Sequence, residues 1–144
     1  MIGILLMSHG RMAEGVLDSA TLFFGDDIPQ IKALCLMPQD DPESFSERID
    51  EAIKEIDDGH GVLGFCDLYG GTPSNRSVLA VNERFQCIPG MNFTMVLEFL
   101  GQRMAEQDIS EVDIDELCQK GRDGIVNLYA RLKEMMAQSS DDEY

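Results

Sequence analysis

The sequence predicts an α/β fold, a doubly wound and mainly parallel sheet with helices on both faces. The chain opens with an unbroken apolar run at 2–7, which is typical of a strand buried on both sides. Short apolar runs then alternate with longer segments whose apolar residues recur at helical spacing. With 144 residues, 44% of them hydrophobic, the chain is long enough for one ordinary domain with a buried core.

The predicted strands are short apolar runs, each followed by a turn or loop: 2–7, 31–36, 61–67 and 85–88. The predicted helices have apolar residues three or four apart: 12–24, 42–56, one that begins at the turn 70–73, 94–107 and 113–120. A loop is expected at 8–10. Asp41 before Pro42 is a capping residue followed by proline at the first helical position. By the same logic, Thr72 is expected to cap the helix that Pro73 begins.

The C-terminal segment is less regular. The apolar residues of 125–132 fit a helix by spacing, but they also fit a strand. Residues 139–144 are polar and acidic, which is typical of disorder. We therefore expect one domain over 1–135 and an acidic, disordered tail over 136–144.

The charge of the chain excludes some partners. There are 27 acidic and 11 basic residues, so the formal net charge is −16. A polyanion repels nucleic acids and anionic lipids, and neither is expected to bind. No apolar run is long enough to insert into a membrane, and the first residues do not resemble a signal peptide. The expected location is the cytoplasm.

The cysteines do not indicate a metal site. Cys35, Cys66, Cys87 and Cys118 form no C-x-x-C pair, and the chain has two histidines. We expect reduced thiols with structural roles and no bound metal. The dinucleotide-binding and P-loop fingerprints are absent from the sequence, so no cofactor is expected either.

Two residues at strand ends suggest a catalytic site. His9 follows the first predicted strand and Asp67 ends the third. Sites of doubly wound sheets lie at the carboxyl ends of strands, where these side chains meet if the two strands are neighbours. A carboxylate that accepts from one imidazole nitrogen leaves the other free to attack. His60 precedes a strand, and we interpret it as a surface turn residue at the opposite edge.

A glycine-rich turn supplies the third part of the predicted site. Gly70, Gly71 and Thr72 lie where a helix begins, so their backbone amides are expected to face an anion. Phosphoryl transfer needs mainly positioning and such positive potential. A nucleophilic histidine, an orienting aspartate and this turn together favour a site that carries phosphate.

Other residues near the site have weaker signals. Ser8 and Gly10 flank His9 and are candidates for supporting roles. Asn92 is a further candidate, for which a purely structural role is an equally good interpretation. Arg11 is interpreted as solvated. Tyr69 is either a contact for a partner or a packing residue, and the sequence leaves both open.

Six sequence pieces, taken in order, resemble the mannose-family IIA component of the bacterial sugar phosphotransferase system. They are SHG at 8–10, AEG at 13–15, DLYGGTPSN at 67–75, GMN at 90–92, MVLE at 95–98 and GRDGI at 121–125. Each piece alone is weak, but the ordered set covers about residues 1–130 and is specific.

The resemblance implies a phosphotransferase that works as a relay. His9 would accept a phosphoryl group on Nε2 from the phosphorylated carrier protein HPr and pass it to a histidine of a IIB component. Asp67 would pair with this histidine. Because an acidic tail stands where some members continue into a IIB domain, a separate IIB subunit is expected. Through this subunit, the chain is expected to associate peripherally with a membrane transporter for sugar uptake. The family's homodimers exchange a C-terminal antiparallel strand, which would fall at 125–129 here.

Two other functions are weighed against this one. The same phosphorylatable fold occurs in regulatory proteins and in the phosphotransfer subunit of dihydroxyacetone kinase. The sequence has no DNA-binding or ATPase segment, and its Gly-Gly-Thr-Pro turn is more similar to the sugar-transport branch. A flavodoxin-like binding module is the third possibility, which a co-purifying cofactor would support.

Overall fold

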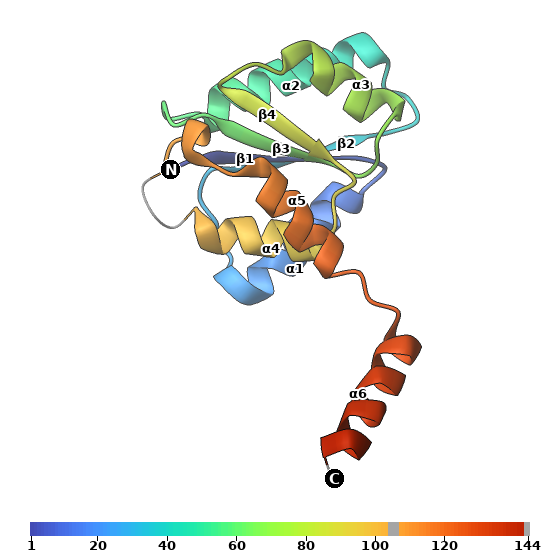
Figure 1. Cartoon of the computed structure of the whole chain (residues 1–144). Helices are drawn as coiled ribbons and strands as arrows, with labels where there is room; N and C mark the ends of the chain where they lie inside the picture. Colours follow the sequence, from blue (N-terminus) through green and yellow to red (C-terminus); the bar gives the residue numbers. More distant parts are fainter. Residues whose placement is uncertain (104–106, 143–144) are drawn as a thin grey trace.

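The apolar runs of the sequence form a single parallel sheet. The computed structural model describes residues 1–103 and 107–142, with side chains through residue 139. In this part of the chain, four strands pair in the order β2-β1-β3-β4 (Figure 1). The strands are β1 (Gly3–His9), β2 (Ile31–Leu36), β3 (Val62–Cys66) and β4 (Phe85–Pro89). The chain thus has the predicted α/β fold, and its first strand lies between β2 and β3.

The register of β1 fixes where the strands end. Met7 lies opposite Leu34 on one side and Cys66 on the other. The strand continues two residues beyond the predicted 2–7, because His9 still pairs with Leu36. The loop predicted at 8–10 is therefore wrong for Ser8 and His9, which are the last two residues of the strand.

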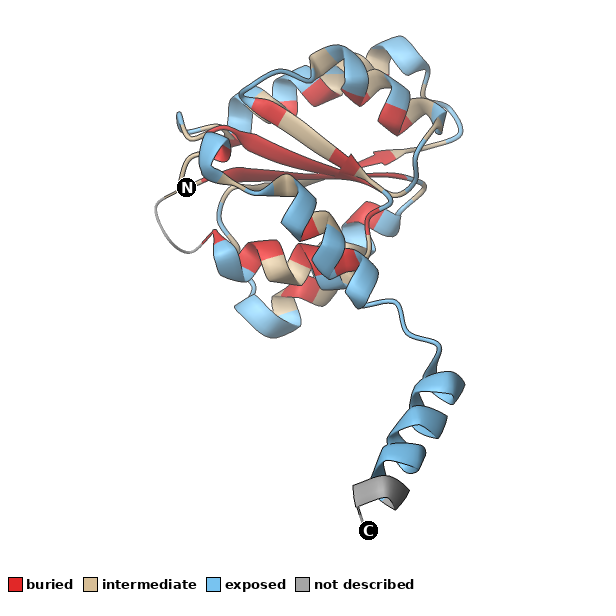
Figure 2. Ribbon diagram, in the orientation of Figure 1, coloured by how far each residue is buried: buried red, intermediate tan, exposed pale blue. Residues whose placement is uncertain are grey.

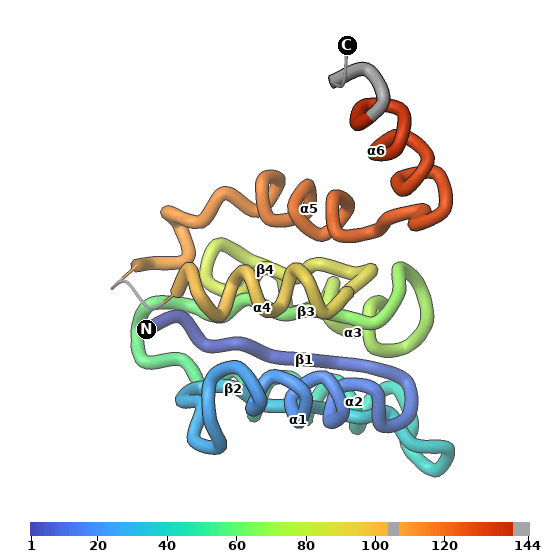
Figure 3. The backbone as a smooth tube through the Cα atoms, turned by 90° about the horizontal axis from the view of Figure 1, so that it is seen from below, coloured from blue at the N-terminus to red at the C-terminus, as the bar shows by residue number. Residues whose placement is uncertain are grey.

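Helices cover both faces of the sheet. On one face lie α1 (Met12–Phe24), α4 (Phe93–Gln102) and α5 (Ile114–Asp123), which Figure 3 shows from below. On the other lie α2 (Pro42–Ile56) and α3 (Gly71–Ala80) (Figure 1). Alternate residues of β1 point to opposite faces and contribute to two separate apolar clusters. Burial on both sides explains why the first strand reads as an unbroken apolar run (Figure 2).

The helix ends follow the capping chemistry of the sequence. Asp41 accepts a hydrogen bond from the Ser44 amide at 2.8 Å, and Pro42 begins α2 as predicted. The helix predicted over 94–107 begins at Phe93 and ends at Gln102, while residues 104–106 lie outside the described ones. The helix predicted over 113–120 runs from Ile114 to Asp123, because the Asp113 side chain caps its start. A short 3-10 helix, Ile109–Glu111, precedes it.

The C-terminal segment differs from the expected strand. Residues 125–127 belong to no helix or strand, and α6 (Leu128–Asp142) follows them. In one chain this segment forms no strand, and the residues from Leu128 onward form the helix that the spacing of their apolar side chains allows. Helix α6 projects from the rest of the molecule and is exposed along its described side chains (Figure 2). Helix α6 also includes residues 136–142, which the sequence predicts to be disordered. The domain boundary at 135 stays a prediction.

Within the described residues, no helix is both long and apolar enough to cross a membrane.

One buried charge was not predicted from the sequence. Arg103 follows α4, is 2% exposed, and donates hydrogen bonds to the backbone carbonyls of Ile2, Pro29 and Gln30. Burial lowers the pKa of its guanidinium to about 10, so the group stays protonated at neutral pH. The side chain thereby fastens the end of α4 to the start of β1 and to the loop before β2.

We expect Arg103→Met to lower the free energy of unfolding by about 2–4 kcal/mol, because buried carbonyls would lose their donor. Urea denaturation measures this loss. Arg48→Met is the matched control: Arg48 is 39% exposed and donates to one carbonyl, that of Cys35, so a loss below about 1 kcal/mol is expected. Equal losses in the two variants would contradict a special role for Arg103.

Candidate functional site

The centre of the candidate site is a histidine–aspartate pair at the carboxyl edge of the sheet. His9 ends β1, and Asp67 directly follows β3. Because β1 and β3 are neighbours with Met7 opposite Cys66, the two strands end side by side. The structure brings the side chains together: His9 Nδ1 lies 2.9 Å from Asp67 Oδ2. The imidazole is 43% exposed, whereas the Asp67 side chain is 9% exposed.

Each carboxylate oxygen of Asp67 has a defined partner. Oδ2 accepts from the His9 backbone amide at 2.9 Å as well as from the ring, and Oδ1 accepts from the Leu68 amide at 3.0 Å. A carboxylate held this way cannot rotate freely, so it fixes the orientation of the ring. With Nδ1–H donating to the carboxylate, Nε2 keeps its lone pair. The arrangement therefore presents Nε2 as a nucleophile.

Gly71 lies directly against the free edge of the imidazole. A Cβ placed on Gly71 would lie 2.7 Å from His9 Cε1 and 2.9 Å from Nε2, closer than a side chain can approach. The residue also has φ of +77°, which favours glycine. The sequence identified Gly71 as a phosphate-binding candidate but missed this contact. Only the fold shows that the absent side chain makes room for the ring.

The turn before α3 lies beside Nε2, because Gly71 closely approaches that edge of the ring. The N-cap residue is Gly70, with φ of +91°, and Gly71 begins the helix. Thr72 is the second helical residue, so its predicted role as the cap is wrong: the positive φ of Gly70 already turns the chain into the helix. No side chain caps this end, and the first amides of a helix have no acceptor within it. The amides of Gly71 and Thr72 thus make the end of α3 attractive to an anion.

Ser8 and Gly10 shape the loop around His9. The Ser8 side chain is fully buried, and its Oγ accepts from the Ala13 amide at 2.7 Å and donates to the Gly10 carbonyl at 3.0 Å. The Gly10 amide donates to the Leu36 carbonyl at 2.8 Å. Both residues therefore join the end of β1 to its neighbours, and their supporting role for His9 stays a prediction.

Asn92 is bonded to helices rather than to the histidine. Its Oδ1 accepts from the Met95 amide at 3.0 Å and so caps α4, and its Nδ2 donates to the Gly121 carbonyl at 2.8 Å in α5. These contacts explain Asn92 structurally, which was one of its two interpretations.

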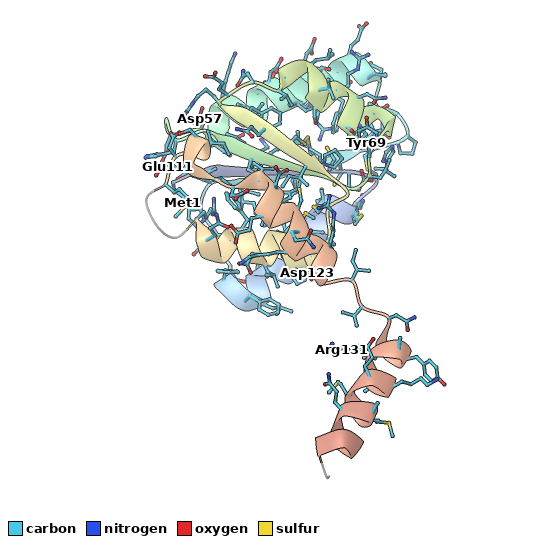
Figure 4. The ribbon with its side chains drawn as sticks, in the orientation of Figure 1. Met1, Asp57, Tyr69, Glu111, Asp123 and Arg131 are labelled. Carbon is cyan, nitrogen blue, oxygen red and sulfur yellow. The ribbon has the colours of Figure 1, made fainter. Side chains whose placement is uncertain are left out.

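The surroundings of the site are open. Tyr69 is 87% exposed, so it does not pack against the rest of this chain, and its contact with a partner stays a prediction. Figure 4 shows it beyond the carboxyl edge of the sheet, with Met1 and Asp57 at the opposite edge. Arg11 is exposed. His60 is bonded to Asp58, Nδ1 to Oδ1 at 2.7 Å, at the edge far from the site, as predicted.

Among residues 1–103 and 107–142, no three histidine, cysteine, aspartate or glutamate side chains are grouped as metal ligands.

We expect Gly71→Ala to slow a reaction at His9 Nε2 by about 10–100-fold, since the new methyl group would displace the ring by a fraction of an ångström or more. Gly70→Ala is the matched control. Gly70 also has a positive φ, so alanine there adds backbone strain of about 1–3 kcal/mol, but its Cβ would meet nothing within 4 Å. Phosphorylation rates and urea denaturation of the two variants separate the effects. Similar rates in both would show that the contact with His9 is unimportant.

The sequence matches known proteins over most of its length. Residues 3–115 match the family model described as PTS system fructose IIA component. The chain is 30% identical over 105 residues to the PTS system fructose-specific EIIA component of Bacillus subtilis, covering 72% of this chain and 71% of that protein. It is 29% identical over 142 residues to the PTS system mannose-specific EIIAB component of Escherichia coli, covering 94% of this chain. That alignment covers 42% of the relative, so the chain spans less than half of its length.

Solved structures share the fold. A phosphotransferase system component EIIA from Streptococcus agalactiae superposes with a TM-score of 0.79 at 22% identity, covering 90% of this chain and 99% of that one. A PTS IIA protein associated with the fucose utilization operon of Streptococcus pneumoniae gives a TM-score of 0.77 at 25% identity, covering 90% and 95%.

Proposed function

The chain belongs to the PTS fructose IIA component family, and from this premise we propose that it is a phosphocarrier of a sugar phosphotransferase system. His9 receives a phosphoryl group from phosphorylated HPr and passes it to a histidine of a separate IIB component. The observation that carries the proposal is the pairing of His9 Nδ1 with Asp67 at 2.9 Å, which leaves Nε2 beside the first amides of α3.

The geometry supports a transfer in which Nε2 is the acceptor atom. Its lone pair attacks the phosphorus, and the bond from phosphorus to the donor nitrogen breaks as the new bond forms. The ring becomes positively charged, and the Asp67 carboxylate on Nδ1–H stabilises that charge. The amides of Gly71 and Thr72 stabilise the negative phosphoryl oxygens. Transfer to the next protein reverses these steps.

The exposure of the site supports a protein as donor and acceptor. The imidazole is 43% exposed and stands on the surface. Exposed apolar side chains lie on the adjoining segments: Met12 at the start of α1, and Leu68 and Tyr69 after Asp67. A protein surface can cover these apolar groups. The protein would act in the cytoplasm, next to a membrane transporter through IIB.

We include a homodimer in the same proposal. β4 has a strand neighbour on one side only within the described residues, so its other edge is free to pair. Ile125 and Val126 are 74% and 56% exposed, and Leu128 and Tyr129 on α6 are 66% and 72% exposed. If two copies exchanged residues 125–129, these side chains would become buried and each exchanged segment would pair with the free edge of β4 in the other copy.

Sedimentation equilibrium of the full chain should give twice the monomer mass. A monomer at micromolar concentration would contradict the exchange.

The test of the relay uses the full chain with phosphorylated HPr. Intact mass should rise by one phosphoryl group, the group should be lost in acid as expected for phosphohistidine, and adding IIB should remove it. No gain in mass, under conditions in which another IIA protein is phosphorylated, would contradict the proposal. Transfer to a dihydroxyacetone kinase subunit but not to IIB would instead support the alternative branch of the fold.

A further inference from the structure

Two thiols face each other beneath the site, on the α2 and α3 side of the sheet. Cys66 Sγ on β3 and Cys87 Sγ on β4 are 3.5 Å apart. Cys66 is fully buried and directly precedes Asp67. Cys87 is partly exposed. Because Cys66 and Asp67 are adjacent in sequence, we expect a displacement of Cys66 to move the aspartate that orients His9.

The surroundings of these thiols link the elements that build the site. Ser77 Oγ on α3 lies 3.6 Å from Cys66 Sγ and 3.3 Å from Met7 Sδ on β1, and it donates to the Pro73 carbonyl at 2.7 Å. The cluster thus touches β1, β3, β4 and α3. The hydrogen bond between the two thiols lowers the pKa of Cys66 and raises that of Cys87. Since the thiolate is the reactive form, Cys66 is the better nucleophile of the pair.

The register of the strands shows what a covalent bond would require. Gly64, not Cys66, lies opposite Cys87, so the two cysteines are diagonal neighbours. Adjacent strands lie about 4.8 Å apart and a parallel strand rises about 3.3 Å per residue, so an offset of two residues separates the Cα atoms by roughly 8 Å, whereas the two Cα atoms of a disulfide are usually about 4.4–6.8 Å apart and its sulfurs about 2.05 Å. The end of β3 therefore has to move toward β4 for the bond to form, and Asp67 moves with it.

We propose that Cys66 and Cys87 are an oxidisable pair whose disulfide displaces Asp67 and slows phosphoryl transfer at His9; its effect on transfer rests on the proposed function. A peroxide oxidises one thiol of the pair to a sulfenic acid, releasing one water. The sulfur of the other cysteine then attacks the sulfenic sulfur, the S–S bond forms, and the hydroxyl leaves with the proton of the attacking thiol as a second water. A dithiol supplies the two electrons that reverse the reaction.

The covalent step is tested on the full chain by intact mass after hydrogen peroxide and thiol alkylation. We expect the loss of two hydrogens and two alkylatable thiols, reversed by dithiothreitol. Cys87→Ser should prevent the loss, whereas the double variant Cys35→Ser, Cys118→Ser should still show it. Retention of all four thiols after peroxide, or a disulfide that persists in Cys87→Ser, would overturn the pair.

The coupling to the site has two readouts. Oxidised protein should accept a phosphoryl group from phosphorylated HPr at least about 10-fold more slowly than reduced protein, and Cys87→Ser should be insensitive to peroxide. The NMR resonances of the His9 ring should shift on oxidation while those of His60 stay in place. If reduced protein accepts no phosphate at all, the proposed function fails, but the NMR spectra still test whether the disulfide alters the surroundings of His9. Unchanged His9 resonances in the disulfide form would overturn the proposed coupling between the cysteine pair and the site.

Discussion

His9→Ala is expected to abolish phosphorylation by phosphorylated HPr. The substitution removes Nε2, the atom that the Asp67 hydrogen bond at Nδ1 leaves free to attack. His9 ends a strand and its side chain is 43% exposed, so the loss of stability should stay within about 1 kcal/mol. Intact mass after incubation measures the phosphoryl group, and urea denaturation confirms that the variant is folded.

The chain contains its own control for this experiment. His60 is also bonded to an aspartate, Asp58, but at the opposite edge of the sheet and away from the Gly70–Gly71 turn that begins α3. His60→Ala should therefore gain one phosphoryl group as the unchanged chain does. A phosphorylated His9→Ala protein that still transfers to IIB would show that another residue is the acceptor.

Asp67→Asn is expected to slow phosphorylation by about 10²–10⁴-fold, a barrier increase of roughly 3–5 kcal/mol. An amide lacks the negative charge that stabilises the positive ring after attack. Its NH₂ group can also donate to Nδ1, which would place the ring proton on Nε2 and block the nucleophile. Rapid-quench measurement of the phosphorylation rate tests this effect, with saturating donor to separate it from weaker binding.

Asp58→Asn, in the second aspartate–histidine pair, is the matched control for Asp67→Asn. Hydrogen bonds from the N-terminal ammonium group and from His60 hold the pKa of Asp58 well below its usual range, so this carboxylate is charged in the folded protein as well. Its replacement should leave the phosphorylation rate within about threefold of the unchanged chain. An Asp67→Asn rate that is equally unaffected would remove Asp67 from the mechanism.

The local sequence was sufficient for most of the fold. The alternation of short apolar runs with helical spacing predicted each strand of the sheet, and Asp41 before Pro42 predicted the start of α2. These predictions work because side-chain periodicity and capping depend on residues that are close in sequence. They fail where two conformations fit equally well, as at 125–132, or where backbone geometry takes over the role of a side chain, as Gly70 does from Thr72.

From the residues alone, apart from the family resemblance, the candidate site was predictable as side chains at strand ends that meet only if the two strands are neighbours. His9 and Asp67 are separated by 58 positions, and they meet because β1 lies between β2 and β3. Strand order depends on which faces pack together over long distances, and no local pattern encodes it. The closeness of Gly71 to the imidazole depends on the same order, since α3 begins where β3 ends beside β1.

The sequence by itself determined the alternation of strands and helices, the strongly acidic surface, and a histidine, an aspartate and a glycine-rich turn placed after strands. Only the tertiary structure decided that these three features form one site. It also decided that Arg103 is buried against backbone carbonyls and that Cys66 lies against Cys87. The physical reason is that hydrogen bonds and steric contacts act over a few ångströms in space, and the packing of the sheet decides which distant residues come within that reach.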